Sequence, residues 1–110
     1  MHEIDLDRGS HPQTGGIVAT GGVMAANPHC VYILESISEP ARHYTGLTSD
    51  IPARIAWHNA GLSSHTAKHR PWRLLVSMNF ADSETAIHFE RYLKSGSGRA
   101  FARRHFSYRD

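Results

Sequence analysis

Two short β-forming segments joined by a turn constrain the fold of this chain most strongly. Residues 30–34 (CVYIL) and 43–48 (HYTGLT) are rich in β-branched and aromatic side chains, which favours strands. The segment between them contains Glu39-Pro40-Ala41, which is typical of a turn. The pattern therefore predicts an antiparallel hairpin. Each strand carries one tyrosine, Tyr32 or Tyr44, so the hairpin would bring two phenol groups onto neighbouring strands.

A short helix is predicted over residues 51–60, directly after the hairpin. N-cap candidates precede this segment and a glycine follows it, as at many helix ends. Ile51 and Ile55 would form one stripe of the helix. Arg54 and His58 would form another, because residues four positions apart are neighbours on a helix surface. The spacing thus predicts that Arg54 and His58 lie side by side.

The rest of the chain predicts a loop over 61–72, a third strand over 73–80, a helix over 83–95 and a short basic helix over 98–106. Ala86, Phe89 and Leu93 would form the apolar stripe of the longer helix, with Glu90 at its edge. Gly96-Ser97-Gly98, between the two helices, is interpreted as a hinge. This order of elements predicts an α+β domain with a small three-stranded, mainly antiparallel sheet flanked by helices.

A flexible N-terminal tail is expected over residues 1–28, ahead of one domain over residues 29–106. The tail is rich in Gly, Ser, Thr and Ala, which bury too little apolar surface to offset their ordering entropy, and one weak strand is expected around residues 17–20. The whole chain has a net charge of +2, but residues 91–110 hold six arginines and lysines against one aspartate, a net charge of +5. This basic end fits either a polyanionic partner such as nucleic acid or a solvated helix.

The single cysteine, Cys30, excludes an intramolecular disulfide and a zinc site built from several cysteines. The N-terminal residues are acidic and lack a continuous apolar stretch, and no segment approaches transmembrane length. The chain is therefore expected to be soluble and cytoplasmic, without a membrane partner.

Two tyrosines, an arginine and a glutamate are candidate functional residues, although each has an ordinary structural interpretation. Tyr32 and Tyr44 fit the core or the surface of a sheet, and Arg54 fits a solvated helix. Glu90 is less ordinary, because a carboxylate near a buried stripe needs a partner. That partner is either an arginine such as Arg54 or a divalent cation.

From Val31 to Lys94, the ordered motifs resemble the GIY-YIG nuclease superfamily. The resemblance is to small stand-alone bacterial-type domains, similar to the N-terminal domain of the excinuclease C subunit. The two signatures are Cys30-Val31-Tyr32 and Tyr44-Thr45-Gly46. The further matching segments are Asp50 to Ile55, His58 to Gly61, Thr66, Arg70 to Leu74, Ala86 to Glu90, and Lys94.

The resemblance implies roles for the two signatures and for the first helix. Tyr44 would contact or deprotonate the attacking water, and Tyr32 would support it near the scissile phosphate. Arg54 would stabilise negative charge on that phosphate. An unperturbed phenol has a pKa of about 10, so activity is expected to rise toward alkaline pH. Leu47 stands where some members of the family have a lysine that would lower the pKa of the tyrosine.

The resemblance also implies a metal site and contacts with the substrate. Glu90 would be the only protein carboxylate on a Mg²⁺ or Mn²⁺ ion, with waters and phosphate oxygens completing the shell. His58 would bond to a phosphate or to Tyr44. Asn59 and Lys94 would bind the substrate or support the catalytic residues.

Arg99, Arg103 and Arg104 would track DNA phosphates from one side of the last helix. We find no sequence-reading module such as a helix-turn-helix, so structured or damaged DNA is the expected substrate. The expected function is a metal-dependent DNA endonuclease that hydrolyses phosphodiester bonds by water attack in repair or recombination. The alternative is a catalytically weak nucleic-acid-binding module on the same fold. A third possibility is an adaptor that docks on a repair protein.

Overall fold

The computed structural model describes residues 27–108. The tail predicted over residues 1–28 therefore lies almost entirely outside the described residues, as does the weak strand expected around residues 17–20. The prediction of an α+β domain with a small antiparallel sheet is confirmed. Among residues 27–108, no helix is long and apolar enough to cross a membrane.

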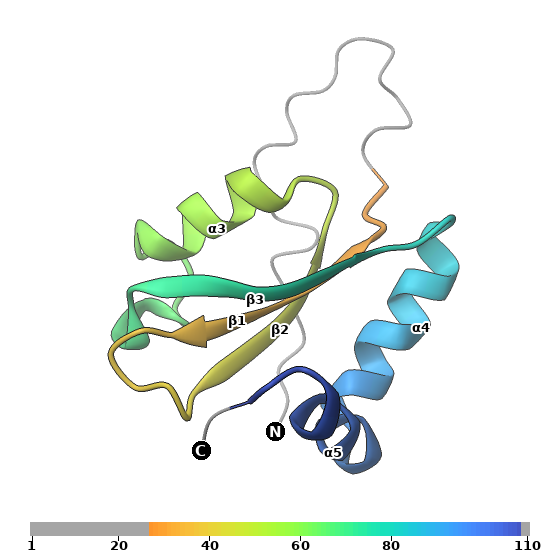
Figure 1. Ribbon diagram of the computed structural model, residues 1–110. Coiled ribbons are helices and arrows are strands. Elements are labelled where there is room, and N and C mark those ends of the chain that lie inside the picture. The colour runs from red at the N-terminus through yellow and green to blue at the C-terminus, as the bar shows by residue number, and fades with distance from the viewer. Residues whose placement is uncertain (1–26, 109–110) are drawn as a thin grey trace, which may run out of the picture.

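Three antiparallel strands form the sheet at the centre of the domain (Figure 1). They are β1 (Cys30–Ser36), β2 (His43–Thr48) and β3 (Trp72–Asn79), in the spatial order β2-β1-β3. The central strand, β1, is buried from Val31 to Ser36, whereas β2 and β3 are edge strands. In the register of β1 and β2, Tyr32 lies opposite Gly46 and Leu34 lies opposite Tyr44.

Helices cover both faces of this sheet. They are α3 (Ile51–Asn59), the short 3₁₀ helix η3 (Ala67–His69), α4 (Ser83–Lys94) and α5 (Gly96–His105). Figure 1 shows α3 on one side of the sheet and α4 and α5 together on the other. The side chains of Asp50, Asp82 and Ser95 each accept a hydrogen bond from a backbone N–H three residues later. These N-caps explain where the three α-helices begin.

One apolar cluster lies on each face of the sheet. The cluster beneath α4 and α5 contains Val31, Ile33, Leu47, Ala86, Leu93 and Ala102. The cluster beneath α3 contains Tyr32, Leu34, Tyr44 and Trp72, with Ile51 and Ile55 packed against it. Successive residues of a strand point to opposite faces, so β1 serves both clusters with alternate side chains. Both signature tyrosines therefore belong to the layer between the sheet and α3.

The burial of α3 differs from its apolar pattern. Arg54 and His58 are the buried side chains of this helix, whereas Ile51 and Ile55 are only partly buried. Burial of an arginine and a histidine is costly unless neighbouring groups compensate it. The side-by-side placement predicted for this pair is thus confirmed, and it faces the interior.

The hinge interpretation of residues 96–98 is wrong, because these residues form the first turn of α5. Gly98 lies where α5 meets α4. A Cβ atom at this position would overlap the carbonyl oxygen of Tyr92 and the Cα atom of Leu93. The glycine therefore permits a close approach of two helices rather than motion between them.

Candidate active site

The two signature tyrosines lie close together on neighbouring strands. Tyr32 is fully buried on β1, and Tyr44 on β2 keeps a small exposed fraction of 8%. Their ring centres are 6.3 Å apart. Since β2 is an edge strand, Tyr44 sits at the margin of the sheet while Tyr32 sits behind it.

The glycine of the second signature makes room for Tyr32. Gly46 is directly opposite Tyr32 in the sheet, and a Cβ atom on it would overlap the Tyr32 hydroxyl and the ring carbon that carries it. Any larger residue at position 46 would push the phenol aside. The Tyr-Thr-Gly spacing is therefore a packing requirement of the site.

His58 joins α3 to the two tyrosines. Its Nε2 atom lies 2.9 Å from the Tyr32 hydroxyl, and its Nδ1 atom lies 2.8 Å from the Thr66 hydroxyl. Its ring also meets the Tyr44 ring edge-on, with 4.9 Å between the centres. His58 was expected to contact a phosphate or Tyr44; both ring nitrogens are in fact hydrogen-bonded within the fold.

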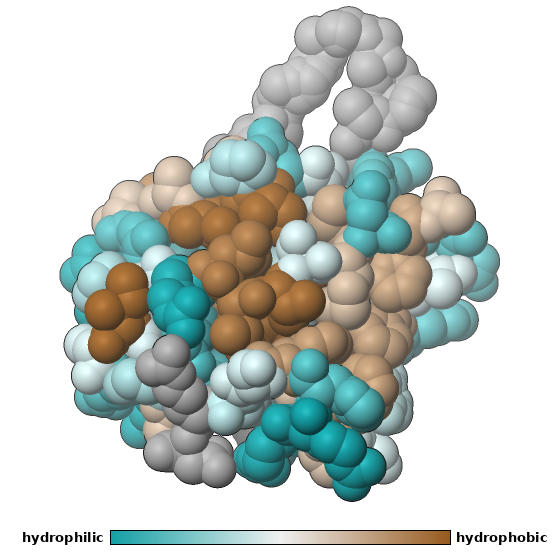
Figure 2. Space-filling model, in the orientation of Figure 1, coloured by the Kyte–Doolittle hydropathy of each residue, from teal (hydrophilic) through white to brown (hydrophobic). Residues whose placement is uncertain are grey.

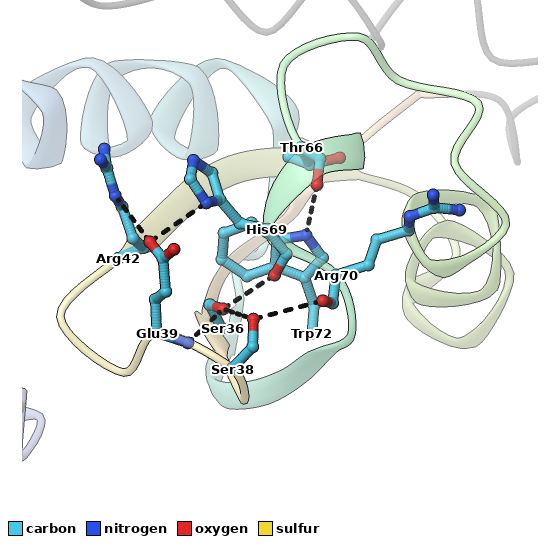
Figure 3. A network of polar contacts seen from close by, with 8 residues as sticks. All are labelled: Ser36, Ser38, Glu39, Arg42, Thr66, His69, Arg70 and Trp72. Carbon is cyan, nitrogen blue, oxygen red and sulfur yellow. Dashed lines mark hydrogen bonds and ion pairs between the residues drawn. The ribbon is translucent and has the colours of Figure 1, made fainter.

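Thr66, which the sequence suggested only as part of the resemblance, proves to position His58. Its backbone oxygen accepts a hydrogen bond from the Trp72 indole at 2.9 Å, and its hydroxyl is bonded to His58. Figure 3 shows the polar network around this loop, in which the Ser36 hydroxyl donates to the His69 backbone oxygen. The loop before β3 is thus hydrogen-bonded to the end of β1, and Thr66 in this loop holds His58 in place.

Arg54 lies one helical turn before His58 and is only 1% exposed. Its guanidinium carbon lies 4.6 Å from the centre of the Trp57 ring, a cation–π distance. The Trp57 ring in turn lies 5.2 Å from the His58 ring. The tryptophan therefore connects the guanidinium to the histidine and tyrosines.

Glu90 is on α4, and its side chain is 2% exposed. The Lys94 Nζ atom lies 2.8 Å from one of its carboxylate oxygens, Oε2. The same Nζ atom lies 5.8 Å from the centre of the Tyr44 ring. Arg54 and a divalent cation were the two partners considered for Glu90, whereas the contact seen is with Lys94. Through Lys94, the carboxylate of α4 belongs to the same site as Tyr44.

The donor set around Glu90 fits Mg²⁺ or Mn²⁺ better than Zn²⁺. Among residues 27–108, no group of three or more His, Cys, Asp or Glu side chains could hold a metal ion. Structural zinc needs four protein ligands, whereas Mg²⁺ is often bound by one carboxylate, waters and substrate phosphates. Glu90 Oε2 is buried without a hydrogen bond of good geometry and has the Lys94 ammonium beside it, as expected for an oxygen that requires a cation.

Four other predicted site residues lie elsewhere. The Asn59 side chain is bonded to the backbone of Trp72, accepting from its N–H at 2.7 Å and donating to its C=O at 3.1 Å. Arg99, Arg103 and Arg104 are exposed on α5, and Figure 2 shows a hydrophilic surface over this helix. A role in DNA binding stays a prediction for all four.

Comparison with known proteins identifies related sequences. The family model of the GIY-YIG catalytic domain matches residues 28–104. A UPF0213 protein of Lacticaseibacillus paracasei is 38% identical over 72 residues, which cover 64% of this chain and 79% of that protein. A UPF0213 protein of Lactococcus lactis subsp. cremoris is 35% identical over 69 residues, which cover 62% of this chain and 68% of that protein.

A longer relative has a more specific description. The structure-specific endonuclease subunit SLX1 of Scheffersomyces stipitis is 39% identical over 67 residues. The match covers 54% of this chain and 20% of the SLX1 protein, so it extends over one part of that relative. No solved structure matches the chain significantly.

Proposed function

Because this chain belongs to the GIY-YIG catalytic domain family, we propose that it is a metal-dependent endonuclease that hydrolyses DNA phosphodiester bonds by direct attack of water. One observation carries the proposal. The Tyr44 ring is in contact with His58, and Lys94, which is paired with Glu90, lies over the same ring. A phenol, an imidazole and a buried carboxylate therefore share one site.

Tyr44 is the group proposed to contact or deprotonate the attacking water. It is slightly exposed at the sheet margin, whereas Tyr32 is fully buried behind it. Tyr32 then acts through its hydrogen bond to His58. A neutral imidazole donates a hydrogen bond from one nitrogen and accepts at the other. The bond between His58 and Thr66 therefore influences whether His58 donates to the Tyr32 hydroxyl or accepts from it. This chain of hydrogen bonds orients the Tyr32 phenol in the absence of DNA.

Arg54 and a metal ion on Glu90 are proposed to stabilise the negative charge of the phosphate. The Trp57 ring holds the Arg54 guanidinium in place, and a preorganised cation in a buried site stabilises developing negative charge strongly. Glu90 would hold Mg²⁺ or Mn²⁺, which when bound supplies polarisation of a phosphate oxygen and an acidic water. The protein contributes a single carboxylate, which is buried and paired with the Lys94 ammonium.

Structured DNA is the proposed substrate, in a repair or recombination context. The similarity to a protein described as a structure-specific endonuclease subunit supports this. The exposed arginines of α5 would add affinity for phosphates without reading sequence.

A catalytically weak nucleic-acid-binding module is the alternative proposal. The arginines of α5 would serve it equally well. The buried Glu90 supports the enzyme, because a carboxylate is a suitable ligand for Mg²⁺ or Mn²⁺, although Lys94 already neutralises its charge.

A substrate panel separates the two proposals. Branched, nicked, single-stranded and plain duplex DNA would be incubated with Mg²⁺, Mn²⁺ or EDTA and the wild type, Glu90→Ala or Arg54→Ala. Circular dichroism would verify that both variants fold. The enzyme predicts metal-dependent cleavage that both variants lose while DNA binding persists. Binding of every substrate by the wild type with no cleavage would support the binding module instead.

A further inference from the structure

Lys94 lies at the junction of the two groups that the proposed reaction needs most. It is the last residue of α4, one helical turn after Glu90. Its Nζ atom lies 2.8 Å from Glu90 Oε2 and 5.8 Å from the centre of the Tyr44 ring. The Lys94 side chain is 13% exposed, against 2% for Glu90, so the lysine also reaches toward solvent.

The contact between Lys94 and Glu90 is a shielded ion pair. Glu90 Oε2 is shielded from solvent and has no hydrogen bond of acceptable geometry, even though the Lys94 Nζ atom is close. A buried carboxylate is costly unless a cation lies beside it. Lys94 therefore supplies the positive charge that Glu90 requires.

Tyr44 receives its nearby positive charge from the same side chain. Leu47, on the same strand as Tyr44, is an apolar residue that is fully buried in the cluster beneath α4 and α5. The Lys94 ammonium instead approaches Tyr44 from α4. A lysine is a compact charge on a flexible stem, so its ammonium can move between acidic partners.

Two cations cannot share this shielded carboxylate oxygen without strong repulsion. We propose that Lys94 is the resident counter-ion of Glu90: it competes with the divalent cation, is released when that cation binds, and then contacts a DNA phosphate beside Tyr44. The inference rests on the proposed function in one respect, which is that Glu90 is the metal ligand. Lys94 is thus a positioning residue that couples metal loading to DNA binding.

The first test measures Mn²⁺ binding by isothermal titration calorimetry on the protein without DNA. Lys94→Met should bind Mn²⁺ about tenfold more tightly than the wild type, because the ion no longer has to displace an ammonium. Lys94→Arg keeps the charge and should bind Mn²⁺ as the wild type does. Lys68→Met removes an exposed lysine from η3 and is the matched control. Unchanged or weaker Mn²⁺ binding by Lys94→Met would overturn the inference.

The second test follows the released ammonium. Fluorescence anisotropy would measure the affinity for a branched DNA in Ca²⁺ and in EDTA, for the wild type and Lys94→Met. The variant should lose affinity in Ca²⁺ and change little in EDTA, because Lys94 reaches the phosphate only after the cation takes Glu90. Equal losses under both conditions would overturn the release, since Lys94 would then contact DNA without any metal.

Two further variants keep the outcomes distinct. If Glu90→Gln leaves Mn²⁺ binding unchanged, Glu90 is not the ligand and the proposed metal site itself fails. If Glu90→Gln abolishes Mn²⁺ binding but Lys94→Met does not tighten it, only the counter-ion role fails. Lys94→Gln provides a second neutral variant if the methionine variant does not fold, and melting temperatures would establish which of the two to use.

Discussion

At the scale of single residues, Gly46 tests how closely Tyr32 is packed. Gly46→Ala would place a methyl group against the Tyr32 hydroxyl. Overpacking of this kind costs about 1–3 kcal/mol and should also shift the phenol away from His58. We expect a lower melting temperature. We also expect the cleavage rate to fall by about tenfold, because the displaced phenol would lose about 1.4 kcal/mol of transition-state stabilisation. A cleavage rate equal to that of the wild type would show that the Tyr32 position is not critical.

Tyr108 offers a test by pH of a phenol that the proposed reaction does not use. Burial raises the pKa of this phenol, and its ring stacks on His43 with 3.8 Å between the centres. Because the unfolded phenol ionises at about pH 10 and the folded one only above that, the wild type should lose stability as the pH rises past 10. Tyr108→Phe should lose less stability over the same range. Urea unfolding at pH 8 and pH 10.5 would measure both, and identical losses would argue against a buried phenol.

The sequence indicated which residues lie next to one another along a helix better than it indicated what surrounds them in the fold. The spacing of Arg54 and His58 placed them together, but it did not reveal that this stripe of α3, rather than the isoleucine stripe, is the buried one. Burial of the polar pair depends on Trp57, Thr66 and Tyr32, which come from other parts of the chain or give no periodic signal. The Glu90–Lys94 pair, by contrast, follows a favourable four-residue spacing that could have been recognised from sequence.

At the scale of elements, the contact between α4 and α5 depends on Gly98. Gly98→Ala would drive a methyl group into the α4 backbone, which cannot move as a side chain can. We expect a loss of about 1–3 kcal/mol in the free energy of unfolding. Gly96→Ala is the matched control, because nothing lies within 4 Å of the added atom. Equal effects of the two substitutions in urea unfolding would contradict this account of the helix contact.

The strands and α-helices were predictable to within about two residues because each has a local signal, either β-branched side chains or an N-cap. Details that depend on how two strands pair could not be predicted from the sequence. Ile33 pairs with Val76 but Leu34 pairs with Leu74, so β3 carries an extra residue, Leu75, at this point. Such a bulge follows from two strands together and leaves no local mark. The glycines of 96–98 were misread for the same reason, since only the neighbouring helix reveals their use.

At the scale of the whole molecule, the arginines of α5 test where DNA lies. Replacing Arg99, Arg103 and Arg104 together by alanine should weaken DNA binding and reduce the slope of log K against log salt by up to about three, at about 0.9 per phosphate contact. Arg42→Ala removes an exposed charge from the turn between β1 and β2 and should reduce the slope far less. An unaltered slope in the triple variant would place the DNA away from α5.

The central claim is that Glu90 and the tyrosines form a metal-dependent nuclease site. The most direct measurement is the single-turnover rate of DNA cleavage in Mn²⁺ by Glu90→Gln, compared with Glu84→Gln, an exposed glutamate on the same helix. Both variants would be used at protein concentrations that saturate the DNA. We predict a fall of about 100-fold or more for Glu90→Gln, equivalent to about 2.7 kcal/mol of transition-state stabilisation, and no change for Glu84→Gln. Equal rates for Glu90→Gln and the wild type would contradict the claim.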